Sequence, residues 1–89
     1  MHIKKFKEVQ AIAGPDYVPV TRDYTEALVK NLGNGCEICI WGFNLNNCYV
    51  MIDIEGRYIG SPIHESLQIE KKNRERLSDV LRDLEARYS

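Results

Sequence analysis

The sequence has no long apolar segment, which excludes a membrane-spanning helix. The longest nearly apolar run covers residues 38–43, whereas about 18 apolar residues are needed to cross a bilayer. Residues 1–8 are basic, as in a signal peptide, but charged Glu8 and polar Gln10 stand where an apolar region would follow. We therefore expect a cytoplasmic protein that has no membrane partner.

The sequence also lacks a surplus of either charge. Its 12 Lys and Arg residues and 13 Asp and Glu residues give a net charge of −1, so no global attraction to nucleic acid is expected. Residues 31–56 contain no Lys or Arg but include Glu37, Asp53 and Glu55. Positive charge gathers near the start of the chain and in a later cluster made of Lys71, Lys72, Arg74 and Arg76. Acidic neighbours such as Glu75 indicate that this cluster is a solvated helix face.

Residues that carry out catalysis or bind metals are scarce. There are two histidines, and the grouping of His64 with Glu65 and Ser66 favours capping of a helix start over a catalytic triad, which distant segments normally assemble. Asp53 and Glu55 have the spacing of a carboxylate pair, but they also flank an expected hairpin turn, where acidic residues are common. We therefore expect a protein that is not an enzyme.

The three cysteines, Cys36, Cys39 and Cys48, together with His64 supply the residue types of a zinc site. In an extended strand, however, Cys36 and Cys39 point to opposite faces, and Cys39 lies roughly 13 to 20 Å from Cys48 at about 3.3 Å per residue. A disulfide between Cys39 and Cys48 is excluded as well, because it needs Cα atoms within about 7 Å. We expect buried thiols, no metal and no cofactor.

The length of 89 residues predicts a single domain over residues 1–89. Large apolar residues recur at every third position of residues 3–13 and favour a helix ended by Gly14, with a short strand over residues 6–12 as the alternative. Residues 16–20 predict an extended connector, because Pro15 directly precedes them and Pro19 lies among them.

A second helix is predicted after residue 22. Asp23 and Glu26 have the spacing of a capping box, and Leu28 and Leu32 share one face of the helix. The Gly-Asn-Gly sequence at residues 33–35 is typical of a helix end.

The strongest helical signal lies at the C-terminus. Apolar residues there have the helical spacing i, i+3, i+4, i+7, i+11, at Leu77, Val80, Leu81, Leu84 and Tyr88. The start of this helix is open. Ser61 and Pro62 fit a helix start and slightly favour one long helix. Leu67 and Ile69 alternate with polar residues, as they would in a fourth strand.

Residues 36–60 predict three antiparallel strands. A two-residue turn at Asn46 and Asn47 pairs residues whose numbers sum to 93. One face is then apolar and forms the core, with Cys39, Trp41, Phe43 and Leu45 opposite Ile54, Ile52, Val50 and Cys48. The other face carries Ile38, Ile40, Gly42 and Asn44 against Glu55, Asp53, Met51 and Tyr49. A four-residue loop preserves both faces, whereas a three-residue loop needs a bulge to do so. A second turn is predicted at Glu55 and Gly56.

Together these patterns predict an α+β fold, in which a three-stranded or four-stranded antiparallel meander packs against two or three helices, including a long C-terminal one. The predicted function is that of a non-enzymatic protein-binding domain, such as an inhibitor, an immunity-type factor or a regulatory protein. The predicted binding residues on the acidic and aromatic sheet face are Ile40, Tyr49, Met51, Asp53, Glu55 and Tyr58. An acidic face suits a basic partner, such as a protein that handles nucleic acid, and self-association is another way to bury it. The alternative is a nucleic-acid-binding domain that uses the basic cluster of residues 71–76.

Overall fold

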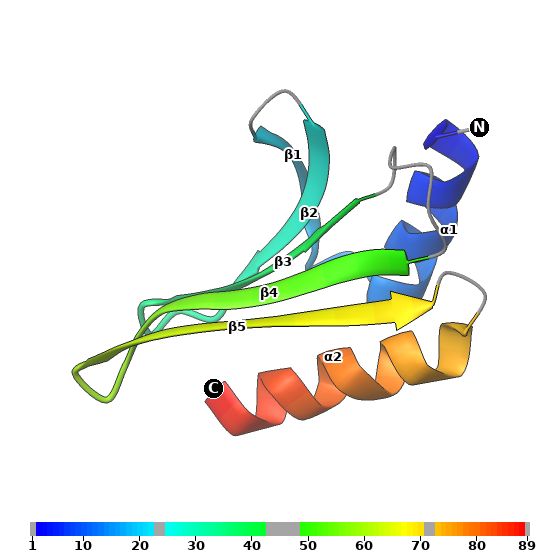
Figure 1. Cartoon of the computed structure of the whole chain (residues 1–89). Coiled ribbons are helices and arrows are strands. Elements are labelled where there is room, and N and C mark those ends of the chain that lie inside the picture. The colour runs from blue at the N-terminus through cyan, green and yellow to red at the C-terminus, as the bar shows by residue number, and fades with distance from the viewer. Residues whose placement is uncertain (1, 23–24, 43–48, 71–72, 89) are drawn as a thin grey trace.

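The computed structural model describes residues 2–22, 25–42, 49–70 and 73–88 of the chain. Its elements are α1 (His2–Ala13), β1 (Val18–Arg22), β2 (Thr25–Asn31), β3 (Cys36–Trp41), β4 (Tyr49–Tyr58), β5 (Ser61–Glu70) and α2 (Arg74–Tyr88). The strands form one antiparallel sheet in the order β1-β2-β3-β4-β5, and both helices pack on the same face of it (Figure 1). The predicted α+β class is confirmed, with five strands instead of three or four and with two helices.

Neither helix within the described ranges combines the length and the apolar character needed to cross a membrane.

The hydrophobic core lies between the sheet and the two helices. Leu28, Ile40 and Ile52 follow one another across three adjacent strands, and each is completely buried. The helices cover them with buried side chains from Val9, Leu77, Leu81 and Leu84. Each large aliphatic side chain buried in this way contributes about 1.5 to 3 kcal/mol. The helix-covered face of the sheet is therefore the main source of stability.

The register between β3 and β4 differs from the prediction by one residue. Cys39 pairs with Asp53, Ile40 with Ile52 and Trp41 with Met51, so paired residue numbers sum to 92 instead of 93. A slip of one residue moves every side chain to the other face of a strand. The predicted core face is therefore wrong for β3, where Ile40 lies in the core in place of Cys39 and Trp41. It is correct for β4, where Val50, Ile52 and Ile54 are buried in the core. The predicted turn and its flanking positions Phe43, Leu45 and Cys48 lie outside the described residues.

The predicted second helix is in fact strand β2. Hydrogen bonding to β1 on one side and to β3 on the other outweighs the weak helical signal of this short segment, which includes the β-branched residues Thr25 and Val29. Leu32 N–H donates to the carbonyl of Cys36 over 2.9 Å, and Gly33 N–H donates to Asn31 Oδ1 over 2.8 Å. The glycine-rich segment therefore closes a hairpin between β2 and β3 instead of ending a helix.

The N-terminal helix is confirmed. It ends where Gly14 takes a φ of 96° and its N–H donates to the carbonyl of Gln10 over 3.0 Å. The connector predicted over residues 16–20 is extended only from Val18 onward, where it pairs with β2 as the edge strand β1; residues 15–17 form a turn. Pro19 is tolerated there because proline cannot donate to a ladder and is confined to sheet edges.

The long helix predicted from Ser61 is wrong, and the alternative of a further strand is correct. Ser61–Glu70 is strand β5, and α2 begins only at Arg74. Asn73 caps this helix, because its side-chain Oδ1 accepts the N–H of Arg76 over 3.1 Å.

The predicted turn at Glu55 and Gly56 is also wrong, since β4 continues through both residues and pairs with β5 up to Tyr58 and Ser61. The chain turns at Ile59 and Gly60, whose φ angles of 52° and 78° are those of a type I′ turn.

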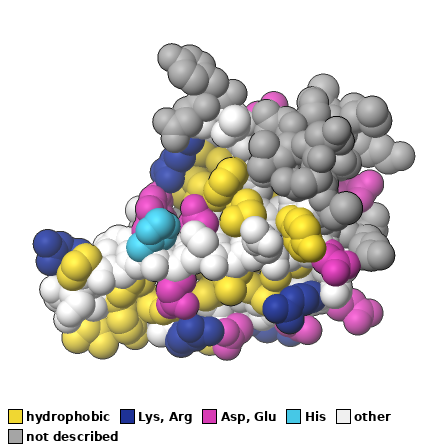
Figure 2. Space-filling model, viewed as in Figure 1, with side chains coloured by type: hydrophobic (Ala, Val, Ile, Leu, Met, Phe, Trp, Pro, Cys, Tyr) yellow, Lys and Arg dark blue, Asp and Glu magenta, His cyan; other side chains and the backbone are white. Residues whose placement is uncertain are grey.

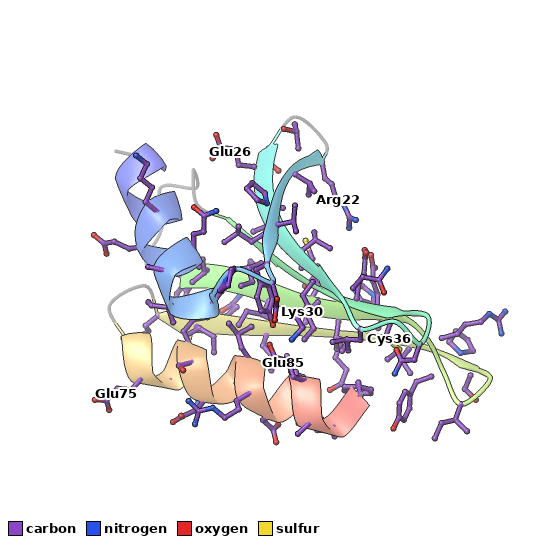
Figure 3. The ribbon with its side chains drawn as sticks, turned by 180° about the vertical axis from the view of Figure 1, so that it is seen from behind. Arg22, Glu26, Lys30, Cys36, Glu75 and Glu85 are labelled. Carbon is purple, nitrogen blue, oxygen red and sulfur yellow. The ribbon has the colours of Figure 1, made fainter. Side chains whose placement is uncertain are left out.

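A polar clamp joins β2 to α2 at the rim of the core. Tyr17 is 1% exposed, and its hydroxyl donates to Glu85 Oε2 over 2.7 Å. Lys30 Nζ lies 3.4 Å from the same carboxylate and 5.9 Å from the centroid of the Tyr17 ring, so Lys30 and Glu85 face each other between the two elements (Figure 3). Burial, reinforced by the hydrogen bond to Glu85, raises the pKa of Tyr17 well above its ordinary value of about 10.

Candidate protein-binding face of the sheet

The face of the sheet that carries no helix is here called the outer face. Alternation along the strands, in the observed register, places on it Val18, Val20, Arg22, Thr25, Ala27, Val29, Asn31, Glu37, Cys39, Trp41, Tyr49, Met51, Asp53, Glu55, His64, Ser66, Gln68 and Glu70. In Figure 2, hydrophobic and acidic side chains gather together above the light band formed by β5. The outer face is therefore a mixed apolar and acidic surface.

Four of the six predicted binding residues lie together on the outer face. Tyr49, Met51, Asp53 and Glu55 follow one another at two-residue intervals along β4. Tyr49 is 41% exposed, Met51 and Asp53 are half-buried, and Glu55 is exposed. The alternation of a strand is sufficient to bring these four together, whatever the register of its neighbours.

Ile40 and Tyr58, the other two predicted residues, lie elsewhere. Ile40 is fully buried in the core, because the register shift exchanges the two faces of β3. Tyr58 points to the helix-covered side, where its ring meets the ring of Tyr88 edge to face with centroids 5.2 Å apart. Neither belongs to the outer face.

Trp41 takes a central place on the outer face. Its indole Nε1–H donates to Asp53 Oδ2 over 3.0 Å, and the hydroxyl of Ser66 donates to Asp53 Oδ1 over 2.7 Å. These bonds connect β3, β4 and β5 and hold the half-buried indole in place. The result is a rigid aromatic platform next to a carboxylate.

A second polar pair lies toward the other side of the sheet. The guanidinium of Arg22 contacts both carboxylate oxygens of Glu37, at 2.6 and 3.3 Å. These hydrogen bonds raise the pKa of Arg22. Burial raises the pKa of the nearby Cys39 thiol, so this group stays protonated at neutral pH and is a poor nucleophile.

Negative charge predominates on the described outer face. Four carboxylates, those of Glu37, Asp53, Glu55 and Glu70, stand there against the single guanidinium of Arg22. A hollow at the end of the face nearest the β2–β3 turn is lined in part by Glu37, Glu55 and His64.

No group of three or more His, Cys, Asp or Glu side chains suited to a metal ion occurs in the part of the chain that the structure describes. Cys36 and Cys39 are free, buried thiols on opposite faces of β3, and the Cys36 thiol donates to the carbonyl of Arg57 over 3.1 Å. Cys48 lies outside the described residues.

Of the basic cluster considered for nucleic-acid binding, the structure describes only the side chain of Arg76. Arg76 is exposed on α2, next to the equally exposed Glu75. Lys71, Lys72 and the side chain of Arg74 lie outside what the structure describes.

Comparison with protein-family models, with curated protein sequences and with solved structures found no match. Trp41, Ser66 and His64 are among the outer-face residues that the prediction from sequence missed. The alternation of residues along β5 could have placed Ser66 and His64 on the outer face. A loop of odd length after β3 would have placed Trp41 there.

Proposed function

We propose that this chain is a small non-enzymatic protein-binding domain, an inhibitor, immunity-type factor or regulatory protein, whose outer face binds a basic protein. The observation that carries the proposal is that Tyr49, Met51 and Trp41 lie beside Asp53 and Glu55 on the face that no helix covers. Tyr, Trp and Met are enriched in protein interfaces, where they supply large contact area at little entropic cost.

The hydrogen bonds of Asp53 give it a structural role on the outer face. Both oxygens of Asp53 already accept hydrogen bonds, from Trp41 and from Ser66. Asp53 therefore orders the platform, and exposed Glu55 is the better candidate for contact with a partner.

The charge of the face supports a basic partner. Carboxylates grouped around an apolar centre attract positive surfaces and repel acidic ones, which affects the association rate and the choice of partner more than the final affinity. A protein that handles nucleic acid presents such a surface in its binding groove, and it is the class of partner that we propose. The same proposal places the chain in the cytoplasm, where free thiols such as Cys36 and Cys39 persist.

The test is affinity capture from a nuclease-treated lysate of the native host with three forms of the tagged chain. Glu55→Lys reverses a charge on the outer face, and Glu75→Lys makes the same reversal on α2, where the side chain points away from the sheet (Figure 3). We expect one stoichiometric protein to be retained by wild type and by Glu75→Lys and to be lost with Glu55→Lys. Equal retention by both variants would remove the outer face from consideration. Loss of all binding after nuclease treatment would instead favour nucleic acid.

A further inference from the structure

The two edges of the sheet differ in their ability to accept another strand. β1 has five residues, and the second of them, Pro19, has no N–H to donate. β5 has ten residues and, among the strands that the structure describes, pairs with β4 alone. Figure 2 shows the outer edge of β5 as a continuous light band of backbone and uncharged polar side chains, with α2 below it. Pairing groups on an open edge are a template for a further strand unless they are blocked. β1 is blocked in this way, whereas β5 is open.

The turn between β4 and β5 determines which amides point outward from this edge. A two-residue type I′ turn is closed by a hydrogen-bonded pair, here Tyr58 and Ser61, and hydrogen-bonded pairs then alternate with open ones along the ladder. The N–H groups that point away from β4 are therefore those of His64, Ser66, Gln68 and Glu70. Pro62 has the same parity, which explains why a proline is tolerated at that position. The carbonyl of Glu70 accepts one hydrogen bond from Asn73 and keeps a second lone pair.

A seam of partly covered apolar side chains accompanies the open edge. Ile63 and Leu67 on β5, and Val80 and Tyr88 on α2, pack against the core but remain half-exposed. Arg87 on the same helix contacts Glu65 of β5, at 3.8 Å between nitrogen and oxygen, which places this flank of α2 beside the edge. A chain that pairs with β5 would cover part of this seam as well.

We propose that β5 pairs antiparallel with β5 of a second copy of this chain, in a register centred on Leu67. Residues that face each other across an antiparallel pair lie on the same sheet face, so in a symmetric pair their numbers must differ by an even number. The two-fold axis then passes through one residue that faces the same residue of the second copy. Centring on Glu65 would oppose two carboxylates, and centring on Ser66 would bring Pro62 into the hydrogen-bonded ladder. Centring on Leu67 opposes two leucines on the helix side.

The same register matches the outward amides and the charges. Ser66 faces Gln68 of the second copy, and His64 faces Glu70 of the second copy. All four residues have outward amides, so the hydrogen-bonded positions of the two edges coincide. The imidazole of His64 stands opposite a carboxylate at both ends of the pair, and like charges face each other nowhere along it. The edge is thus complementary to itself.

The dimer would contain a continuous ten-stranded sheet, with its helices on one side and both outer faces on the other. This proposal does not depend on the proposed function, because the edge pairs through backbone groups of β5, whereas the platform around Trp41 is built from side chains. Dimerisation would place two outer faces side by side, and a partner with two basic sites could then engage both.

The oligomeric state of the full chain is measured by sedimentation velocity over about 1 to 200 µM. We expect wild type to reach twice the monomer mass of 10.3 kDa. Gln68→Pro removes an outward N–H that β4 does not use, so this variant should fold and stay monomeric. Thr21→Pro is the matched control, because Thr21 shares the outward parity of Pro19 on the other edge, and it should dimerise like wild type. A monomeric wild type, or a dimer that persists in Gln68→Pro, overturns the proposal.

Cysteine cross-linking tests the register independently of the proline variant. Facing residues in an open pair have Cα atoms about 4.5 Å apart, which lies within the range of a disulfide. Leu67→Cys should form a covalent dimer under mild oxidation above the background of the native cysteines, and Gln68→Cys should not. The reverse result, or equal cross-linking of both variants, contradicts the register centred on Leu67. A wild type that stays monomeric but takes up an added extended peptide along β5 would assign the edge to a different occupant.

Discussion

Truncation of Ile40 and of Trp41, which are neighbours on β3, distinguishes the two faces of the sheet. Ile40 is fully buried between Leu28 and Ile52. Ile40→Ala removes three carbon atoms, at about 0.8 kcal/mol each, and leaves a cavity between paired strands that cannot close, for a total loss of about 4 kcal/mol. Trp41→Ala removes a half-buried ring and one hydrogen bond to Asp53. Water can replace that bond, so we expect a loss of about 1 to 2 kcal/mol.

The assay is urea denaturation followed by far-UV circular dichroism, a signal that does not depend on Trp41. Ile40→Val serves as the conservative control and should cost about 1 kcal/mol. Equal slopes of the unfolding free energy against urea would show that the variants unfold from the same compact state. If Trp41→Ala lost more stability than Ile40→Ala, the observed register and the assignment of the core face would both be refuted.

Three further predictions concern local features of the fold. Ile59→Asn should raise the unfolding free energy by about 1 kcal/mol, because Ile59 is 86% exposed and has a φ of 52°, a conformation that asparagine adopts more readily; unchanged or lower stability in urea would contradict this. Gly56→Ala should lower the unfolding free energy by about 3 kcal/mol or more, because the new Cβ would overlap the carbonyl oxygen of Gly35. Gly33→Ala should lower it by about 1 kcal/mol, because open space surrounds the new Cβ and only the φ of 80° is unfavourable for alanine. Tyr17 has a raised pKa in the folded state, so its neutral hydroxyl contributes fully to the unfolding free energy below about pH 10, and this contribution declines at higher pH by up to about 1.4 kcal/mol per pH unit. The difference in unfolding free energy between wild type and Tyr17→Phe should therefore narrow above about pH 10. A constant difference would contradict the raised pKa of Tyr17.

The sequence predicted the elements whose signal is local. The C-terminal helix followed from five apolar positions at helical spacing, of which Leu77, Leu81 and Leu84 are buried. Residues 3–13 lie within helix α1, and the antiparallel arrangement of β3 and β4 is also confirmed. To predict each of these elements, the periodicity of its own segment and a turn or helix-breaking residue at its end are sufficient.

The errors arose where tertiary pairing outweighs local signals. β2 carries a helical spacing at Leu28 and Leu32, but two neighbouring strands supply its hydrogen bonds. In β5, the charge at Glu65 interrupts the apolar alternation between Ile63 and Leu67. That carboxylate is accommodated because Tyr88 donates a hydrogen bond to it and Arg87 lies close to it, and both partners come from a distant helix.

The candidate site was predicted only in part, because some of its positions depend on local alternation and others on the pairing of distant strands. Positions on β4 share a face by alternation alone, so Tyr49, Met51, Asp53 and Glu55 were grouped correctly. Positions on β3 depend on the parity of the loop that joins the two strands, and a one-residue difference exchanged Ile40 for Trp41. Contacts between distant strands, such as that of Arg22 with Glu37, have no counterpart in local sequence.

The central claim, that the outer face binds a protein, is tested most directly by site-specific photo-cross-linking in the native host. A photoreactive residue at position 51 replaces half-buried Met51 on the outer face, and one at position 79 replaces exposed Asp79 on α2. The account predicts a single covalent adduct with a basic protein from position 51, weakened by Glu55→Lys, and no such adduct from position 79. An adduct that forms only from position 79, or one from position 51 that is insensitive to Glu55→Lys, would contradict it.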